Sequence, residues 1–335
     1  ADFIHLRNHS GYSLLEGALK VKDLVNRTKE LGMPAVAITD TGNLFGALEF
    51  SETCINEGIQ PIIGTQLDVT SFKPTAECEK FGSDRQQVQI GEPDQIVLIA
   101  QNKIGYANIL KLVSDFHLEP DGNAEPRISI ERLEEYSDGI IAFTGASKGG
   151  VGRLLAEGQN DAAEELLVKL KKIYGDRLYV EIQRHNLHIE KQIEAPLINL
   201  AYKYELPLIA TNECFFDTED IYEAHDALIC ISAGAYVDQS ERKRLTIEHR
   251  FKSPSEMRSL FSDLPEAVDN TLVVARRCSV MAEAREPLLP KAPKEVENGD
   301  LSDDDVLRVL STKGLDIRLD RRFSQYTMDG AAKLQ

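Results

Sequence analysis

The first residues of the chain carry a pattern typical of a metal site, interrupted by one residue of the wrong kind. His5, Arg7 and His9 are spaced two apart, so on a strand their side chains lie on one face. Imidazole is the commonest side-chain ligand of metal ions, whereas the guanidinium of arginine is always charged and has no lone pair to donate. Two interpretations follow: a working metal centre for hydrolysis, or a former centre kept for another purpose.

Further polar residues occur within or directly after other predicted strands. They are Asp40, Gln66, Glu181, Asn212, Glu213 and Cys214. Functional groups of βα barrels gather at the C-terminal ends of the strands, so we expect these side chains to lie near one another. A mixture of imidazole and carboxylate suits zinc or manganese, with a bound water activated for hydrolysis.

Structural roles are the alternative for most of these residues. Asp40 precedes a Gly–Asn turn and a helix, so it is placed to cap as well as to bind a metal. His185 and His188 follow a strand and are expected at the surface, while Cys214 is expected to be a small buried apolar residue. Glu181 lies within an apolar strand, where a carboxylate needs a partner.

Other chemistries find little support in the sequence. It contains no P-loop, no dinucleotide-binding glycine motif and no G-x-S-x-G. The glycine-rich segment 147–158 precedes a helical pattern and could cradle a phosphate, but we interpret it first as a strand–helix turn.

Seven short apolar runs alternate with helical patterns. The predicted strands are 3–8, 35–39, 60–69, 95–100, 139–145, 178–184 and 206–211, and the predicted helices between them are 21–31, 44–57, 105–115, 160–173 and 189–203. Continuous apolar strands indicate burial on both faces and hence a parallel sheet. This pattern predicts a distorted seven-stranded, TIM-like βα barrel.

Several segments lack this alternation. We expect surface loops at 71–94 and 118–129, a helix over 264–280, a Pro-rich charged linker at 285–305 and a short helix near 303–320. The predicted organisation is therefore one domain over 1–280, followed by a linker and the beginning of a further region over 281–335. We expect the chain to be part of a longer protein.

Composition limits the class of partner. Lysines and arginines number 38 against 55 acidic residues, a net charge of 38 − 55 = −17, which disfavours binding along DNA through phosphate neutralisation. The one dense basic run, 241–250, is expected to be a solvated face. Five scattered cysteines without a C-x-x-C pair fit reduced thiols, and there is no signal peptide and no membrane-length apolar run, so a cytoplasmic location is expected.

Six motifs, in order and spacing, resemble a known family. They are "HLRNHSGYSLLEG", "AITDTGNLFGALEF", "GIQPIIGTQLDV", "LIAQNKIGYANILKLVS", "PLIATNECFF" and "YEAHDALICI". Over about residues 3–280 the chain resembles the PHP (polymerase and histidinol phosphatase) domains at the N-terminus of bacterial DNA polymerase III alpha subunits. Residues 281 to about 320 resemble the lead-in to the polymerase palm, and the last dozen residues match nothing we can place.

The resemblance implies which positions held metal ligands. Metal-binding members carry zinc or manganese and can act as 3′–5′ exonucleases. At their ligand positions this chain retains His9, Glu16, Asp40 and Glu213 but has Arg7, Thr41, Gln66, Ala146 and Phe215 where such members have ligands. Since divalent ions usually need three or more good protein donors, we expect at most one weakly bound ion of zinc, manganese or magnesium. Arg7 is expected to pair with the remaining carboxylates instead.

The implied function is that of a PHP domain with a degraded metal site. Such a domain serves DNA replication as a scaffold and as the docking site of the proofreading exonuclease subunit, without catalysis of its own. Other polymerase holoenzyme subunits are expected partners, DNA is expected to bind domains outside this fragment, and no membrane is expected. The alternatives are a metal-dependent phosphoesterase, acting as 3′–5′ exonuclease or pyrophosphatase, and a free-standing enzyme like histidinol phosphatase.

Overall fold

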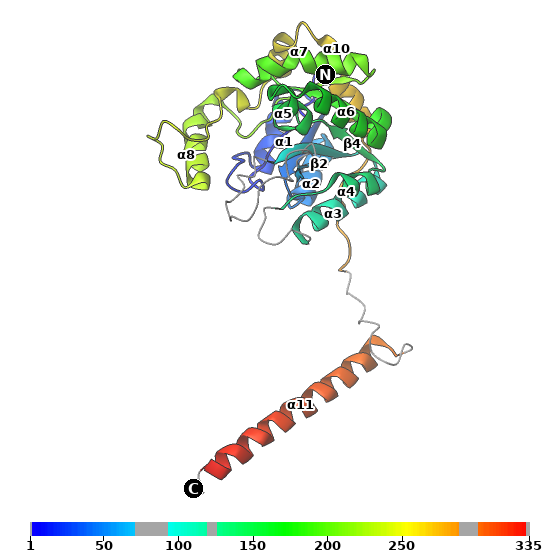
Figure 1. Ribbon diagram of the computed structural model, residues 1–335, viewed down its shortest axis with the longest axis vertical. Helices are drawn as coiled ribbons and strands as arrows, with labels where there is room; N and C mark the ends of the chain where they lie inside the picture. Colours follow the sequence, from blue (N-terminus) through cyan, green and yellow to red (C-terminus); the bar gives the residue numbers. More distant parts are fainter. Residues whose placement is uncertain (1, 71–92, 119–125, 288–300, 333–335) are drawn as a thin grey trace, which may run out of the picture. The chain divides into compact units, whose positions relative to one another are not determined.

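The computed structural model describes residues 2–70, 93–118, 126–287 and 301–332 (Figure 1). The chain divides into two compact units, residues 1–283 and 284–335, which are described separately. Most of the predicted loops at 71–94 and 118–129 and of the predicted linker at 285–305 lie outside the described residues, as does Cys78.

The first unit is built on one mixed sheet. Its strands, in the order β1-β2-β3-β4-β5-β6, are β1 (Ala35–Thr41), β2 (Gln60–Val69), β3 (Asp94–Ala100), β4 (Ile140–Phe143), β5 (Leu178–Ile182) and β6 (Leu208–Ala210). Strands β4, β5 and β6 are buried along their whole length and β1 is buried except at Thr41. The burial on both faces that the continuous apolar runs predict is therefore confirmed for these strands.

One feature of the predicted barrel is wrong, and a second is not confirmed. Strand β3 runs antiparallel to both β2 and β4, so the sheet is not wholly parallel. The structure has six strands among the described residues, because the predicted strand over 3–8 is not regular. The Asn8 N–H binds the hydroxyl of Thr39 instead of a backbone carbonyl, and only an isolated bridge links Asn8 to Cys214.

This irregular N-terminal segment nevertheless lies between two parts of the sheet. On one side the Ala37 N–H donates to the carbonyl of His5, and on the other the Cys214 N–H donates to the carbonyl of Arg7. Arg7 and His9 are thereby placed next to the ends of β1 and β6.

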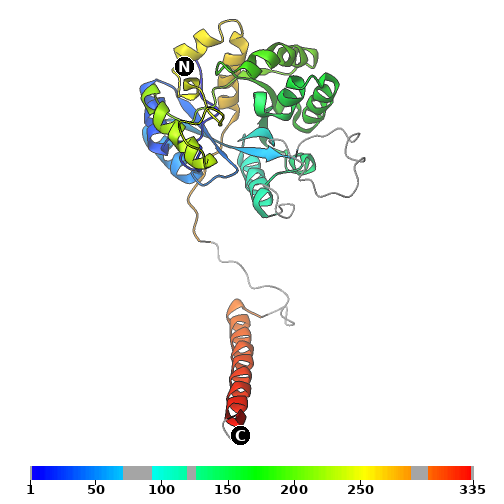
Figure 2. The same ribbon diagram turned by 60° about the vertical axis from the view of Figure 1, so that its left-hand side comes forward.

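Helices surround the sheet (Figure 2). They are α1 (Val21–Glu30), α2 (Ala47–Glu57), α3 (Lys103–Leu118), α4 (Ile130–Glu135), α5 (Gly150–Ala156), α6 (Asn160–Tyr174), α7 (His188–Lys203), α8 (Tyr222–Ala233), α9 (Pro254–Leu260) and α10 (Pro265–Arg277). The five helices predicted between the strands are confirmed to within about three residues at each end. Local chemistry explains several ends: Gly58 terminates α2 at φ +72°, and Ser253 caps α9 in a capping box with Glu256.

The second unit contains α11 (Asp303–Ala332). This helix is longer than the one expected over 303–320. It begins with three aspartates in its first turn, where acidic side chains complement the helix dipole. None of the helices in the described parts of the chain is long and apolar enough to span a bilayer.

A close backbone approach makes Gly105 a sensitive position in the fold. A Cβ added there would lie 1.8 Å from the carbonyl oxygen of Gly139, in the turn before β4. We expect Gly105→Ala to lower the free energy of unfolding by about 3 kcal/mol, because backbone must move to admit the methyl group. Urea unfolding measures this, with exposed Ala107→Ser on the same helix as control, expected within about 0.5 kcal/mol of wild type. Equal midpoints for all three proteins would contradict the packing described.

Candidate functional site

Arg7 lies at the centre of a buried group of polar side chains. Its guanidinium has no solvent exposure and donates from Nη1 to Glu181 Oε2 at 2.9 Å. Nη2 donates to Gln66 Oε1 at 2.5 Å and to Glu213 Oε1 at 3.0 Å. Gln66 lies in β2, Glu181 in β5 and Glu213 after β6, so one side chain joins three separated parts of the sheet.

Lys148 supplies a second positive charge to this group. Its Nζ lies 2.8 Å from Glu213 Oε2, and it comes from the turn that follows β4. Together Arg7, Lys148, Glu181 and Glu213 form what we call the ionic cluster. It contains two positive and two negative charges, so it is neutral without any bound ion.

The charges in the ionic cluster reinforce one another's ionisation. Burial by itself would raise the pKa of Glu213, but Arg7 and Lys148 outweigh burial and hold that pKa well below its usual range. Burial would likewise lower the pKa of Arg7, but the charges of Glu181 and Glu213 raise it above the ordinary arginine value. Both groups therefore remain charged although water is excluded.

His9 and its neighbours form the second part of the site. His9 Nε2 lies 3.3 Å from Glu213 Oε1, and its ring is stacked on that of Phe215 with centroids 4.4 Å apart. Thr41 Oγ1 donates to Glu16 Oε2 at 2.8 Å and lies 3.3 Å from His9 Nδ1. The hydroxyl of Thr41 thus bridges the side chains of His9 and Glu16.

Asp40 turns away from the ionic cluster and holds a loop. Its carboxylate accepts hydrogen bonds from the Ser10 N–H at 2.6 Å, the Ser10 hydroxyl at 2.8 Å and the Ser13 hydroxyl at 2.7 Å. Both of its oxygens are engaged by the segment after His9. The anchoring role is therefore the observed one, although the helix that follows Asp40 is not what it caps.

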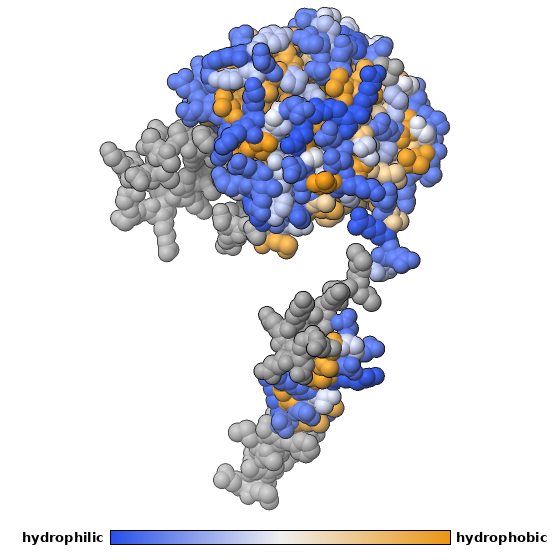
Figure 3. Space-filling model, turned by 90° about the vertical axis from the view of Figure 1, so that its right-hand side faces the viewer, coloured by the Kyte–Doolittle hydropathy of each residue, from blue (hydrophilic) through white to orange (hydrophobic). Residues whose placement is uncertain are grey.

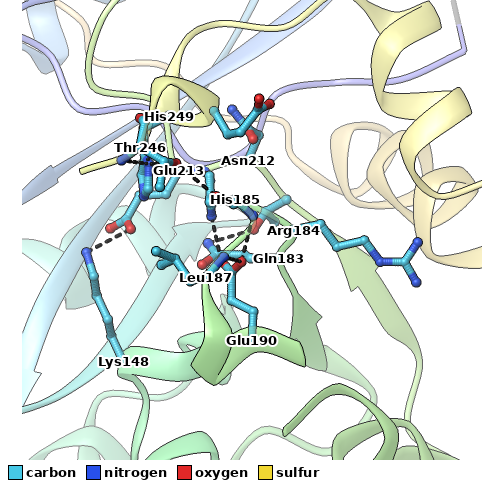
Figure 4. A network of polar contacts seen from close by, with 12 residues as sticks. Lys148, Gln183, Arg184, His185, Leu187, Glu190, Asn212, Glu213, Thr246 and His249 are labelled. Carbon is cyan, nitrogen blue, oxygen red and sulfur yellow. Dashed lines mark hydrogen bonds and ion pairs between the residues drawn. The ribbon is translucent and has the colours of Figure 1, made fainter. Parts of the chain in front are cut away.

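Two stacked histidines lie next to Glu213 (Figure 4). The rings of His185 and His249 are 3.9 Å apart at an interplanar angle of 12°. His185 Nε2 accepts from the Glu213 N–H at 3.2 Å, and His185 Nδ1 lies 2.7 Å from Glu190 Oε1. The histidine therefore connects the backbone of Glu213 to a buried carboxylate on α7.

The position of His185 differs from the sequence-based expectation. It was expected at the surface together with His188, but its side chain is 1% exposed while His188 is exposed. The reason is Glu190, three residues into the next helix, whose carboxylate accepts from the His185 and Leu187 N–H groups and folds the loop inward.

Asn212 and Cys214 lie apart from the ionic cluster. Lys252 donates to Asn212 Oδ1 at 2.9 Å, and Cys214 Sγ lies 3.5 Å from His5 Nδ1. Burial raises the pKa of the Cys214 thiol to about 12, so it is a buried neutral group, as expected. His5 packs its ring against Phe251, and its Nε2 lies 2.8 Å from the Lys252 carbonyl oxygen. Hence only Arg7 and His9 of the opening triplet reach the site.

The basic run 241–250 is partly tied to the fold. Arg242 binds both oxygens of Asp226 on α8, at 2.7 and 2.6 Å, and Arg250 pairs with Glu219 and Glu256. Lys243 and Arg244 remain exposed. The prediction of a uniformly solvated face is therefore wrong for Arg242 and Arg250.

Comparison with known proteins identifies the family. Residues 5–185, more than half of the chain, match the PHP domain family. The chain belongs to the PHP family. It is 43% identical over 293 residues to DNA polymerase III subunit alpha of Caulobacter vibrioides, covering 87% of this chain and 25% of that protein. The corresponding protein of Rickettsia bellii is 37% identical over 322 residues, covering 96% of this chain and 26% of that protein.

The chain thus spans about a quarter of the length of these curated relatives. Among solved structures it is similar to an amidohydrolase from Chromobacterium violaceum, at 14% identity and a TM-score of 0.42, covering 68% of this chain and 97% of that one. At that level of likeness nothing further follows for this chain.

The donors of this PHP domain, as arranged, do not fit a divalent metal ion. A guanidinium lies between Glu181 and Glu213, and both oxygens of Asp40 accept hydrogen bonds from the protein. The side chain of Ala146, two residues before Lys148, has no polar atom, and the side chain of Phe215 is an apolar ring. Within residues 2–70, 93–118, 126–287 and 301–332, no three His, Cys, Asp or Glu side chains are grouped to hold a metal.

Three participants were not singled out from the sequence: Lys148, Glu190 and His249. Lys148 lies in the glycine-rich segment 147–158, and His249 lies in the basic run 241–250. Their roles depend on chain segments that are far apart in sequence. Only a glutamate at the third position of α7, as in a capping box, could have indicated the Glu190 contact.

The ionic cluster predicts the effect of removing its central charge. Arg7→Met should lower the free energy of unfolding by about 3–5 kcal/mol at neutral pH, because Glu181 and Glu213 lose their buried partner. The double variant Arg7→Met/Glu213→Gln should recover part of this loss.

The same variant should respond to acid in a defined direction. The lowered pKa of Glu213 stabilises the fold above its unfolded value of about 4.3, and that stabilisation is lost as the pH falls through the folded value. The difference between wild type and Arg7→Met in urea unfolding should therefore shrink below about pH 4. A pH-independent difference would contradict the charge assignment.

Three buried histidines predict a second pH dependence. Burial lowers the pKa of His5 to about 4, of His185 to about 3 and of His249 to about 2. The unfolded chain takes up these protons below about pH 6.5, so the free energy of unfolding falls between pH 6.5 and 4 by up to about 1.4 kcal/mol per pH unit for each histidine. In urea unfolding at several pH values, His185→Gln should reduce this slope by up to about 1.4 kcal/mol per pH unit, the contribution of one proton. The exposed control His188→Gln should leave the slope unchanged.

Proposed function

We propose that this chain is the PHP domain of a replicative DNA polymerase III alpha subunit. In that role it acts in DNA replication as a structural scaffold and as the docking site of the proofreading exonuclease subunit, without catalysis of its own. The observation that carries the proposal is Arg7, a fixed positive charge buried between Glu181 and Glu213 at the position of a metal ligand. Identity to alpha subunits over most of the chain supports the replication context.

The scaffold role is supported by contacts that replace those of a metal ion. A bound cation neutralises clustered carboxylates and joins the strands that carry them. Here Arg7 and Lys148 supply that charge, and Arg7 contacts residues of β2, of β5 and of the chain after β6, so the joining function persists while no water is activated. A seven-stranded closed arrangement, with residues 3–9 as an irregular seventh member, is the form of barrel that we propose.

The acidic charge of the chain limits the partners that we propose. The net charge of −17 favours protein over DNA as the ligand of this domain, so we propose that DNA binds parts of the alpha subunit beyond this fragment. The proposed domain extends over 1–280, with 281–335 as the linker toward the palm, and the proposed location is the cytoplasm.

A binding and activity test decides between scaffold and enzyme. The chain should bind the purified exonuclease subunit of the same organism in isothermal titration, and it should not hydrolyse single-stranded DNA or pyrophosphate with manganese or zinc. It should also extend no primer, because polymerisation needs a carboxylate pair on a palm sheet.

The alternative is a metal-dependent phosphoesterase, either a 3′–5′ exonuclease or a pyrophosphatase. His9, Glu16, Asp40 and Glu213 are the residues that would support one weak ion. Stoichiometric manganese or zinc after dialysis, with turnover that disappears in His9→Ala, would replace the scaffold proposal by this one.

A further inference from the structure

The loop over residues 10–17, which we call the display loop, exposes two leucines. Leu14 is 72% exposed and Leu15 is 48% exposed, although leucine is among the residues most often buried. Leu15 also has a φ of +61°, in the left-handed region that favours glycine. A strained apolar residue held in solvent indicates a role outside the fold of the isolated chain.

The display loop is fixed rather than loosely attached. Asp40 accepts three hydrogen bonds from Ser10 and Ser13, and Thr41 donates to Glu16. On the other side, His225 Nε2 of α8 lies 2.7 Å from the Glu16 carbonyl oxygen. Residues at former ligand positions therefore determine how the two leucines are presented.

The turn leading into α2 lies beside the display loop and adds to its apolar surface. Asn43 donates to the Tyr12 carbonyl, and a Cβ on Gly46 would lie 2.8 Å from the Tyr12 ring, so the two segments are in contact. This turn and the first residues of α2 expose Phe45 by 68% and Leu48 by 41%.

We call Leu14, Leu15, Phe45 and Leu48 the apolar surface. Both segments that carry it lie at the blue end of the chain in Figures 1 and 2. On the face drawn in Figure 3, apolar residues are scattered between hydrophilic ones.

Acidic side chains flank this apolar surface. Glu16 and Glu49 are bound to the hydroxyls of Thr41 and Tyr12, and Glu52 follows one turn later on α2. Among the ion pairs of the described residues, none neutralises these three carboxylates with a lysine or arginine. The surface therefore combines exposed apolar side chains with an uncompensated negative rim.

We infer that the apolar surface docks a protein segment that carries apolar side chains next to lysines or arginines. The inference rests on the docking role proposed above and assigns it a location and a partner chemistry. Apolar contact supplies the buried area, and opposite charge at the rim orients the partner and excludes acidic competitors. A nucleic acid or a second copy of this acidic chain has the wrong charge.

The test uses two matched double variants and the purified exonuclease subunit. Leu14→Glu/Phe45→Glu adds two carboxylates to the apolar surface, whereas Val168→Glu/Val273→Glu adds two to exposed apolar positions on α6 and α10. We expect the first to weaken binding at least tenfold in isothermal titration and the second less than twofold. High salt should weaken binding by wild type.

Leu15→Gly separates binding from folding. Glycine adopts φ +61° without strain, so the melting temperature should stay equal or rise, while the affinity for the exonuclease subunit falls at least threefold. A lower melting temperature with unchanged affinity would show that Leu15 serves the fold and would overturn the inference.

The remaining outcomes distinguish the inference from the proposed function. Equal binding by wild type and Leu14→Glu/Phe45→Glu overturns the location but leaves exonuclease docking intact. If the exonuclease subunit does not bind, amide exchange of residues 10–17 is measured with each other purified holoenzyme subunit: protection by one supports the surface alone, and protection by none overturns both. A dimer of the chain alone that Leu14→Glu/Phe45→Glu dissociates also overturns the inference.

Discussion

A single buried guanidinium sets the conditions under which this domain folds. Arg7 has no solvent exposure, and the ion pairs of its guanidinium within the described residues are with Glu181 and Glu213, which are buried as well. Isolated charges in such surroundings are costly, whereas a paired and hydrogen-bonded group is tolerated. The N-terminal segment, β5 and the chain after β6 must therefore come together for any of the three to be buried.

The surrounding polar groups are also buried, and hydrogen bonds or a neutral state stabilise them instead of ion pairs. Asp40 forms no ion pair with a residue of the described ranges and accepts hydrogen bonds from a backbone N–H and two hydroxyls of the display loop. His185 and His249 remain neutral, and Glu190 fixes the orientation of the first through its Nδ1. Both oxygens of Asp40 and the Nε2 atom of His185 are thus engaged by protein donors, and these contacts order the loops that carry them.

The buried polar contacts also determine how a surface loop is presented. Asp40, Thr41 and Glu16 hold the display loop in a conformation that leaves Leu14 and Leu15 in solvent. Loops placed by a rigid scaffold are where proteins most often carry binding function. The hydrogen bonds from Asp40 and Thr41 to the loop therefore determine the positions of the apolar side chains that the loop exposes.

The sequence by itself determined most of the strand and helix pattern over 35–210 and the family, because apolar periodicity and motif order are local properties of the chain. It also required a partner for Glu181. It could not determine that β3 runs antiparallel, that residues 3–8 are irregular, that His185 is buried or that Lys148 reaches Glu213. Many contacts of the site join side chains that are far apart in the sequence, as Arg7 and Glu213 are, 206 positions apart. Only the tertiary structure brings such groups within hydrogen-bonding distance, and burial then decides which charges are paired.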